Sequence, residues 1–157
     1  MDESNSIANC RVEDLLAAIA SAHVSPGAGA AGAVALGLAA ACLGKALTIS
    51  LKHRAEDLEL RQASDTCAQI ARLALMDAER DAVEFARFIH SHSSEDANRL
   101  MDTGKAVIAL ANALETLVNR VETRVAANMR GDLVAARALI GAAHTIHAHN
   151  ESDLERG

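Results

Sequence analysis

Aromatic side chains are nearly absent from this chain, which has no Trp, no Tyr and only two Phe among its 157 residues. Strands of globular proteins are enriched in aromatic and β-branched residues, and no short segment of that kind is present. Proline, the residue least compatible with a helix interior, occurs once, at Pro26. Alanine, which has the highest helix propensity, dominates the hydrophobic half of the composition. The sequence therefore predicts an all-α fold.

Positive charge and cysteine are also scarce, and each shortage excludes a class of protein. The formal net charge of −6 argues against nucleic-acid binding, because phosphate contacts need a basic surface. The three cysteines are an odd number without metal-type spacing, which indicates reduced thiols rather than disulfides or a zinc site. Residues 1–10 are polar and acidic, unlike a signal peptide. We therefore expect a soluble cytoplasmic protein that binds no nucleic acid.

One run of the chain, residues 30–51, is long and apolar enough to cross a bilayer. It consists mostly of Ala and Gly, which contribute little to insertion, and Lys45 lies well inside it. A charged side chain near the centre of a span costs about 2.5–3.5 kcal/mol. We therefore predict that this run is a buried helix of a bundle and not a membrane segment.

Hydrophobic periodicity and helix breakers predict a bundle of about five helices, two of them long. The second helix is Gly/Ala-rich and apolar all round, so we expect it to be the buried centre of the bundle. In the first helix, Leu15, Leu16 and Ile19 are expected to face the core, and Asp132 is expected to cap the fifth helix. The predicted helices span residues 12–22, 30–52, 56–90, 95–128 and 132–149, within a single domain at 11–150 flanked by disordered tails at 1–10 and 151–157.

An alanine-rich core buries little apolar area in each helix, so a single subunit of this size gains only modest stability from packing. Pairing with a second copy along a long helix face would bury more surface. We therefore expect a homodimer.

Two features could carry chemistry. The loop at residues 25–30, Ser-Pro-Gly-Ala-Gly-Ala, leads into a helix, and small residues before a helix start allow an anionic group to approach free backbone N–H groups. A plain interhelical loop has the same composition. Asp81 neighbours the apolar stripe of the third helix, where burial would raise the pKa of its carboxyl and suit it to proton transfer. His144, His147 and His149 cluster near the end of the last helix without a visible third ligand or outer shell, so no metal site is predicted and the role of these histidines stays open.

The order of several motifs resembles the formiminotetrahydrofolate cyclodeaminase and methenyltetrahydrofolate cyclohydrolase family. The loop at 25–30 is similar to the family's Pro-Gly-Gly-Gly-Ser loop, and residues 81–85, DAVEF, are similar to its Asp-Ala-x-Ala-Phe in a long third helix. Asn128, followed by RGDL at 130–133, resembles the family's Asn before Arg-Ser-Asp-Leu. Asn150 falls where the family has an Asn near the end of the following helix. Together the matches cover residues 12–150.

The resemblance implies an all-helical homodimer with a crevice between helices that binds a small-molecule substrate. Such enzymes close or open a C–N ring on a one-carbon folate derivative, with folate as the substrate and without a metal or redox cofactor. In this sequence Asp81 and Asp132 would relay protons. The implied ligand-binding residues are Ser25, Gly27, Gly29, Asn128 and Asn150.

The chain also departs from the family, and the departures keep two alternatives open. Ala28 and Ala30 stand in place of a loop glycine and serine, and Gly131 stands in place of a serine. One alternative is a biosynthetic cyclase with the same fold and a non-folate substrate. The other is a non-catalytic helical protein for binding or assembly. Convergence of Asp81, Asp132 and Asn150 on the Gly loop would favour an enzyme, because perturbed carboxylates gathered in a pocket are typical of active sites.

Overall fold

The computed structural model describes residues 6–156, and within that range every regular element is helical. The predicted all-α bundle of five helices is confirmed. The helices are α1 (Val12–Ile19), α2 (Ala28–Leu51), α3 (Leu58–Ser91), α4 (Ser94–Val121) and α5 (Arg130–Arg156), and two short 3-10 turns, η2 (Glu122–Arg124) and η3 (Ala127–Met129), join the last two.

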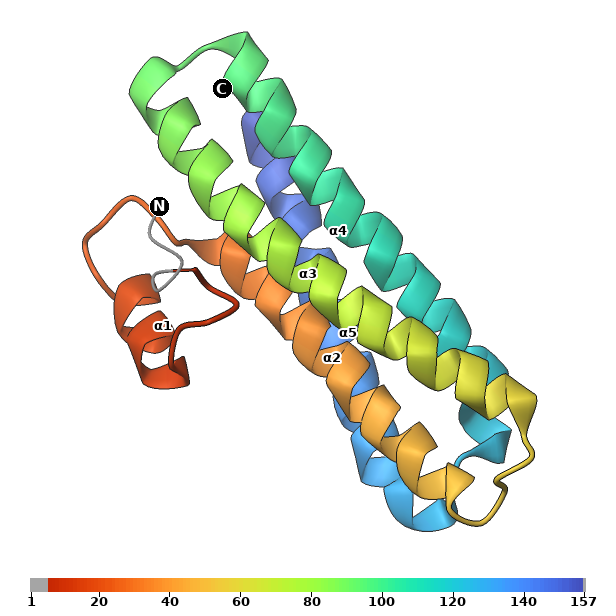
Figure 1. The fold of residues 1–157 in the computed structure, drawn as a ribbon. Coiled ribbons are helices and arrows are strands. Elements are labelled where there is room, and N and C mark those ends of the chain that lie inside the picture. The colour runs from red at the N-terminus through yellow and green to blue at the C-terminus, as the bar shows by residue number, and fades with distance from the viewer. Residues whose placement is uncertain (1–5, 157) are drawn as a thin grey trace.

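Helices α2 to α5 form an antiparallel four-helix bundle in which consecutive helices run in opposite directions (Figure 1). α2 packs against α3 and α5, and α4 packs against the same two helices from the other side. The short connections force neighbours in sequence to be neighbours in space, as expected for an up-down bundle. The beginning of α2 and the end of α5 therefore lie at the same end of the bundle.

α2 contributes most of the small side chains of the core. Its buried face alternates Ala with Leu36, Leu43 and Leu47, all fully buried. The prediction of a buried Gly/Ala-rich helix is correct for this face. The outer face stays open, because each helix in a ring of four keeps one side toward solvent, and Leu38 is 55% exposed. Among the described helices, α2 alone has the length and mean hydropathy (1.8) of a membrane span, and it packs within the bundle.

The first helix does not face the core as predicted. α1 lies beside the four-helix bundle (Figure 1), and none of its residues is buried. Leu15 and Ile19 are half-buried, and Leu16 is 62% exposed. The physical reason is that α2 to α5 already close a ring, so α1 has no place between them and rests outside with its apolar stripe only partly covered.

The predicted fourth helix runs too far, because α4 ends at Val121 rather than near Asn128. The backbone of Val125 is extended (ψ 140°), which breaks the helix between the two 3-10 turns. This turn is held from α2: the N–H of Ala126 donates to Oγ of Ser50 at 2.9 Å, and Ser50 is buried. A tertiary contact therefore ends a helix that the local sequence would continue.

The fifth helix begins earlier and ends later than predicted. It starts at Arg130, so Asp132 lies in its first turn and does not cap it. It also continues through the predicted tail to Arg156, whose Nε donates to the carbonyl of Ser152 and whose guanidinium pairs with Asp153 at 2.6 Å. Such contacts between residues three and four apart stabilise a last helical turn.

Part of the predicted N-terminal tail, residues 1–5, lies outside the described residues, as does Gly157. Residues 6–10 form a hydrogen-bonded turn against the bundle. Ile7 packs against the hydrophobic core, and its N–H donates to Oε2 of Glu79 on α3 at 2.7 Å. This contact fixes the approach of the chain to α1.

Candidate functional site

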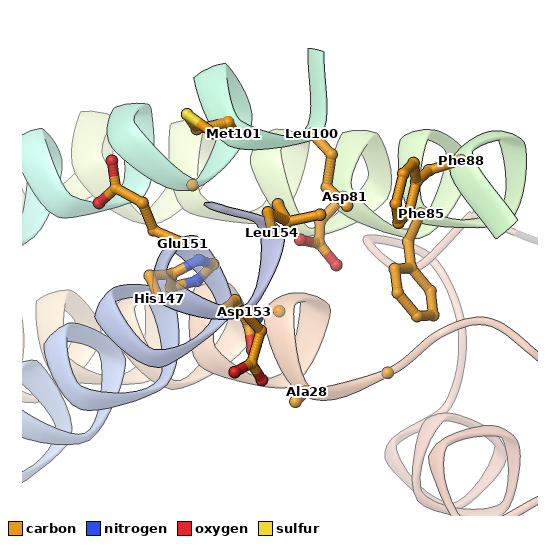
Figure 2. A pocket seen from close by; sticks show the side chains of 14 residues that line it. Ala28, Asp81, Phe85, Phe88, Leu100, Met101, His147, Glu151, Asp153 and Leu154 are labelled. Carbon is orange, nitrogen blue, oxygen red and sulfur yellow. The ribbon is translucent and has the colours of Figure 1, made fainter. Parts of the chain in front are cut away.

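A pocket of about 400 Å³ lies at the end of the bundle where α2 and α4 begin and α3 and α5 end. Figure 2 shows side chains from three of these helices turned toward it, while α2 contributes its first turn. A cavity of this volume is within the usual range for small-molecule sites. The closed ring of helices, and not any single motif, creates it.

Asp81 is buried in this pocket at 5% exposure and lies directly against the start of α2. A Cβ on Gly29 would come within 2.6 Å of its Oδ2, so only glycine leaves room for the carboxyl. Burial raises the pKa of Asp81 to about 6, against a smaller lowering by a hydrogen bond from the N–H of Ala30. Asp81 forms no ion pair with any residue of the range 6–156. It is therefore a carboxyl that can both hold and release a proton near neutral pH.

His147 projects from α5 between two glycines and is 1% exposed. Its Nε2 lies 3.0 Å from the Cβ position of Gly32 on α2, and its Nδ1 lies 3.6 Å from that of Gly104 on α4. Burial lowers the pKa of the imidazole, opposed by a weaker attraction to the carbonyl of Gly29. Nε2 is buried and makes no well-formed hydrogen bond within the described part of the chain.

His147 was not among the residues predicted for the site, since its sequence context is that of one of three histidines near the end of the last helix. A signal for it existed. His147 continues the stripe of apolar residues that faces the core, at alternating steps of three and four. A histidine in register with such a stripe is buried by the helix geometry. The preceding members of that stripe are Leu133, Ala136, Ile140 and Ala143.

Both aromatic residues of the chain, Phe85 and Phe88, line this pocket. They lie on α3 one turn apart, and Leu100 and Met101 of α4 line the same pocket. Figure 2 shows Phe85 and Phe88 on the same side of the pocket as Asp81. The wall beyond the carboxyl is therefore apolar, and it offers the only aromatic surface that the sequence possesses.

The charged side chains that line the pocket are all acidic. Glu151 and Asp153 of α5 join Asp81, and none of the described residues that line the pocket is Lys or Arg. Glu151 is paired with Lys105 at 3.8 Å, and Asp153 with Arg156 at 2.6 Å. Asp81 lacks such a partner, so the buried end of the pocket favours a cationic group over an anionic one.

Four of the residues predicted from the sequence meet here: Gly27, Gly29, Asp81 and Asn150 all line the pocket. Ser25 lies close by but is turned away, because its Oγ donates to the carbonyl of Ala82 at 2.7 Å. That bond ties the loop before α2 to α3. Of the three residues expected to converge on the Gly loop, Asp81 and Asn150 line the pocket and Asp132 does not.

Asp132 and Asn128 are not part of this group. Both lie at the opposite end of the bundle, where α5 begins (Figure 1). The carboxylate of Asp132 is 3.5 Å from Nζ of Lys45 on α2, and Asn128 is exposed in η3. Neither residue reaches the pocket within one chain, because α5 separates them from it by most of its length.

The helix start that was expected to hold an anionic ligand group already faces an anion of the protein itself. α2 begins at Ala28 after Gly27, and the N–H of Ala30 in its first turn is directed to Asp81. An acidic group at this position is favoured by the helix dipole. Asp81 thus has a structural role, the stabilisation of the start of α2, in addition to facing the pocket.

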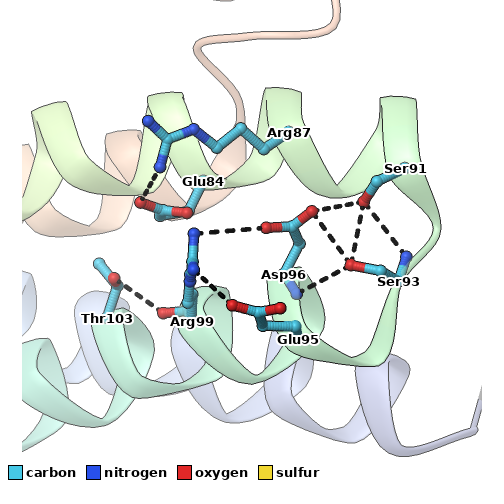
Figure 3. A network of polar contacts seen from close by, with 8 residues as sticks. All are labelled: Glu84, Arg87, Ser91, Ser93, Glu95, Asp96, Arg99 and Thr103. Carbon is cyan, nitrogen blue, oxygen red and sulfur yellow. Dashed lines mark hydrogen bonds and ion pairs between the residues drawn. The ribbon is translucent and has the colours of Figure 1, made fainter.

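The turn between α3 and α4, next to the pocket, is held by a network of polar contacts (Figure 3). Ser93 caps α4: its Oγ accepts from the N–H of Asp96 at 3.2 Å. The carboxylate of Asp96 accepts from Ser91 and Ser93, and the bond from Ser91 is the main reason that the pKa of Asp96 is lowered. Arg99 pairs with Glu95 one turn along the helix. These contacts fix the helix ends that carry Phe88 and Leu100.

Within residues 6–156, no group of three His, Cys, Asp or Glu side chains is arranged to hold a metal ion. His144 is half-buried outside the pocket lining, and His149 is exposed with its Nε2 3.4 Å from Asp153. The three clustered histidines therefore point in different directions, and His147 alone enters the pocket.

Comparison with known proteins adds no assignment. No protein-family model matches the chain, and a search of curated proteins gives no significant match.

Proposed function

We propose that this pocket is the active site of an enzyme that closes or opens a C–N ring on a small molecule, as cyclodeaminases and cyclohydrolases do. The observation that carries the proposal is Asp81, a buried carboxyl with no salt-bridge partner among residues 6–156, whose pKa is raised to about 6. Burial of an unpaired carboxylate costs free energy, and perturbed carboxyls in pockets are typical of catalytic sites.

The reaction needs proton transfer at a carbon between two nitrogens. Attack of water or of an amine on an amidinium carbon gives a tetrahedral intermediate, and one C–N bond then breaks as its nitrogen takes a proton. Asp81 is suited to take a proton from the tetrahedral intermediate and to pass it to the departing nitrogen, because both of its protonation states are populated near pH 6. No metal or redox cofactor is needed for this sequence of steps.

The character of the lining supports a substrate with a delocalised positive charge. A cyclic amidinium is planar and cationic, which suits an acidic pocket with two Phe side chains in its wall. The amide of Asn150 can donate or accept hydrogen bonds at the same end of α5, and the glycine backbone at 27–29 leaves room for a flat ring. A one-carbon folate derivative carries such a centre.

A non-folate substrate is the second candidate, and the acidic lining favours it. Folates carry carboxylates on their glutamate tail, and the pocket lining includes Glu151 and Asp153 without any Lys or Arg among its described residues. Like charges across a binding site weaken association. A smaller amidinium without a carboxylate tail avoids this repulsion. In that case the protein is a biosynthetic cyclase with the same chemistry.

We further propose that the enzyme is a cytoplasmic homodimer. Exposed apolar side chains on the outer faces of α2 and α3 support this: Leu38 is 55% exposed, Met76 is 61% exposed and Leu73 is partly exposed. Pairing of two such faces would remove them from water. A dimer would also supply the burial that a core rich in alanine lacks.

The first test is thermal unfolding with folate derivatives, including a stable formyl form, and separately with a small cyclic amidinium that lacks carboxylates. A ligand at about 100 times its dissociation constant stabilises the fold by about 2.7 kcal/mol. Stabilisation by a folate supports the folate substrate, and stabilisation by the small amidinium alone supports the non-folate cyclase.

The second test is turnover of whichever compound binds, measured for wild type and for Asp81→Asn. We expect the variant to lose at least about 10²-fold in kcat, the usual contribution of a general acid or base. Binding without turnover in wild type would reject the enzyme and favour a binding protein.

A further inference from the structure

We propose that His147 is the second proton-transfer residue of this pocket, the base that accepts a proton from the attacking water while Asp81 serves the departing nitrogen. The inference rests on the proposed function and deepens it by assigning a residue that neither the motifs nor the resemblance pointed to. It starts from geometry: two ionisable side chains, from α3 and α5, are buried in one pocket and approach the same turn of α2.

The two glycines beside His147 explain how an imidazole reaches the centre of the bundle. A Cβ on Gly32 would lie 3.0 Å from Nε2 and 3.1 Å from Cγ2 of Ile146, which is tighter than ordinary packing. Gly104 faces the other nitrogen from α4 and lines the pocket itself. The ring is thus held between α2 and α4, with Nε2 on the α2 side and Nδ1 on the side of the pocket wall formed by Gly104.

A buried histidine in a structural role normally has its polar atoms paired with protein groups. Nε2 of His147 has no hydrogen bond to the described residues, and it faces α2 beside Gly32. The proposed role places the hydrogen of the neutral ring on Nε2. Nδ1 then keeps a free lone pair, which is what a general base requires.

Burial, and not the surrounding charged groups, decides the protonation of the imidazole. α3 contributes Asp81, α5 contributes Glu151 and Asp153, and α4 contributes Lys105, which pairs with Glu151. The only charged residue of α2 is Lys45, which pairs with Asp132 at the far end. Burial dominates over these groups and lowers the pKa of His147 below 6.5. A neutral imidazole and a partly protonated carboxyl therefore coexist in one site.

His147 and Asp81 each carry out one of the proton transfers in the hydrolysis of an amidinium. Nδ1 of His147 takes one proton from water as the water oxygen bonds to the carbon, which gives a neutral N–C(OH)–N intermediate. Asp81 takes the hydroxyl proton and passes it to the departing nitrogen as that C–N bond breaks. The products are an amide and an amine, and the imidazolium releases its proton to solvent, so one proton is formed overall.

The test compares wild type with His147→Gln and with the matched control His144→Gln, one helical turn earlier on α5 and outside the pocket. Steady-state kinetics on the amidinium substrate are measured from pH 5 to 9, with thermal unfolding as a check of the fold. We expect His147→Gln to lower kcat by about 10²- to 10⁴-fold with little change in KM, and to reduce the acid decline of kcat/KM to the single titration of Asp81 near pH 6. The control should match wild type in both.

If His147→Gln does not fold, histidine ring NMR of the wild-type protein replaces it. The His147 signal is then expected to titrate below pH 6.5, together with the acid decline of kcat/KM, and to shift when the substrate analogue binds. A ring that titrates separately from activity and ignores the ligand overturns the assignment.

The possible failures are distinct. Normal turnover and an unchanged pH profile in His147→Gln reject the role of His147 while leaving the proposed function intact. A wild-type protein that neither binds nor turns over any amidinium rejects the proposed function itself.

Discussion

Gly29 and Asp81 are in direct contact, although 52 residues separate them: a Cβ on Gly29 would lie 2.5 Å from Cγ of Asp81. The carboxyl occupies the space above the first turn of α2, with its hydrogen bond from the N–H of Ala30. This contact joins the glycine loop to the long third helix. The glycine loop before α2 and the carboxyl of Asp81, which lie far apart in the sequence, are therefore one structural unit.

Gly29→Ala should therefore destabilise the fold and displace Asp81. The added methyl overlaps a carboxyl held on a packed helix, and overpacking of this kind costs about 1–3 kcal/mol. Urea unfolding would measure it. The matched control is Gly141→Ala on α5, where a Cβ meets nothing within 4 Å. Replacing a helical glycine by alanine without a clash should stabilise that variant by about 0.5–1 kcal/mol. Equal effects of the two substitutions would contradict the contact.

The raised pKa of Asp81 makes stability depend on pH. Folding favours the neutral carboxyl, so this contribution is fully present below about pH 3.8 and is lost as pH rises through about 6. Asp81→Asn removes the titration. Relative to that variant, wild type should lose about 2 kcal/mol between pH 4 and pH 7, since each pKa unit corresponds to about 1.4 kcal/mol and the unfolded carboxyl is already partly ionised at pH 4.

Urea unfolding of both proteins across this pH range measures the difference. A constant difference between them would show that Asp81 titrates in the folded protein as it does in the unfolded chain.

Asp132→Asn tests the residue that the resemblance had assigned to catalysis. Its ion pair with Lys45 lies near the surface at the far end of the bundle, and such pairs contribute about 0–1 kcal/mol. We expect a small change in melting temperature and unchanged turnover. A large loss of turnover with an unchanged melting temperature would instead give Asp132 a chemical role, for which a second copy of the chain would have to bring it to the pocket.

The proposed dimer predicts a solution mass of twice 16.4 kDa by light scattering. Leu38→Lys places a charge on the open face of α2 and should shift the mass toward the monomer, because the lysine would have to be desolvated in the interface. Val134→Lys on α5 is the control, since Val134 is also exposed but lies on another helix. A wild-type mass near 16.4 kDa in dilute solution would reject the dimer.

Helix content was predictable because it depends on local preferences. Alanine, the lack of aromatic strands and the breakers around Pro26 were sufficient to predict five helices, and the stripe of α3 was sufficient to place Asp81 near the core. Helix ends were less predictable where distant residues decide them. α4 stops at Val121 because Ser50, some 70 residues earlier, accepts a hydrogen bond from the following turn.

The residues of the candidate site were also predictable only in part. The motifs identified Gly27, Gly29, Asp81 and Asn150, which the fold brings together, but also Asp132 and Asn128, which it keeps at the other end. They missed His147, although its position in the apolar stripe of α5 was visible. A residue type shows what a side chain can do, and only its place along a helix axis shows which end of the bundle it reaches.

The sequence by itself determined an all-helical chain with one apolar helix, an acidic surface and a glycine loop before that helix, because composition and periodicity act through neighbouring residues. The tertiary structure alone decided that the ring closes with four helices and leaves α1 outside. It also decided that Phe85, Asp81 and His147 share one pocket. These outcomes depend on how helices of unequal length pair over their whole extent, and small shifts in that pairing move whole side chains from one end of the bundle to the other.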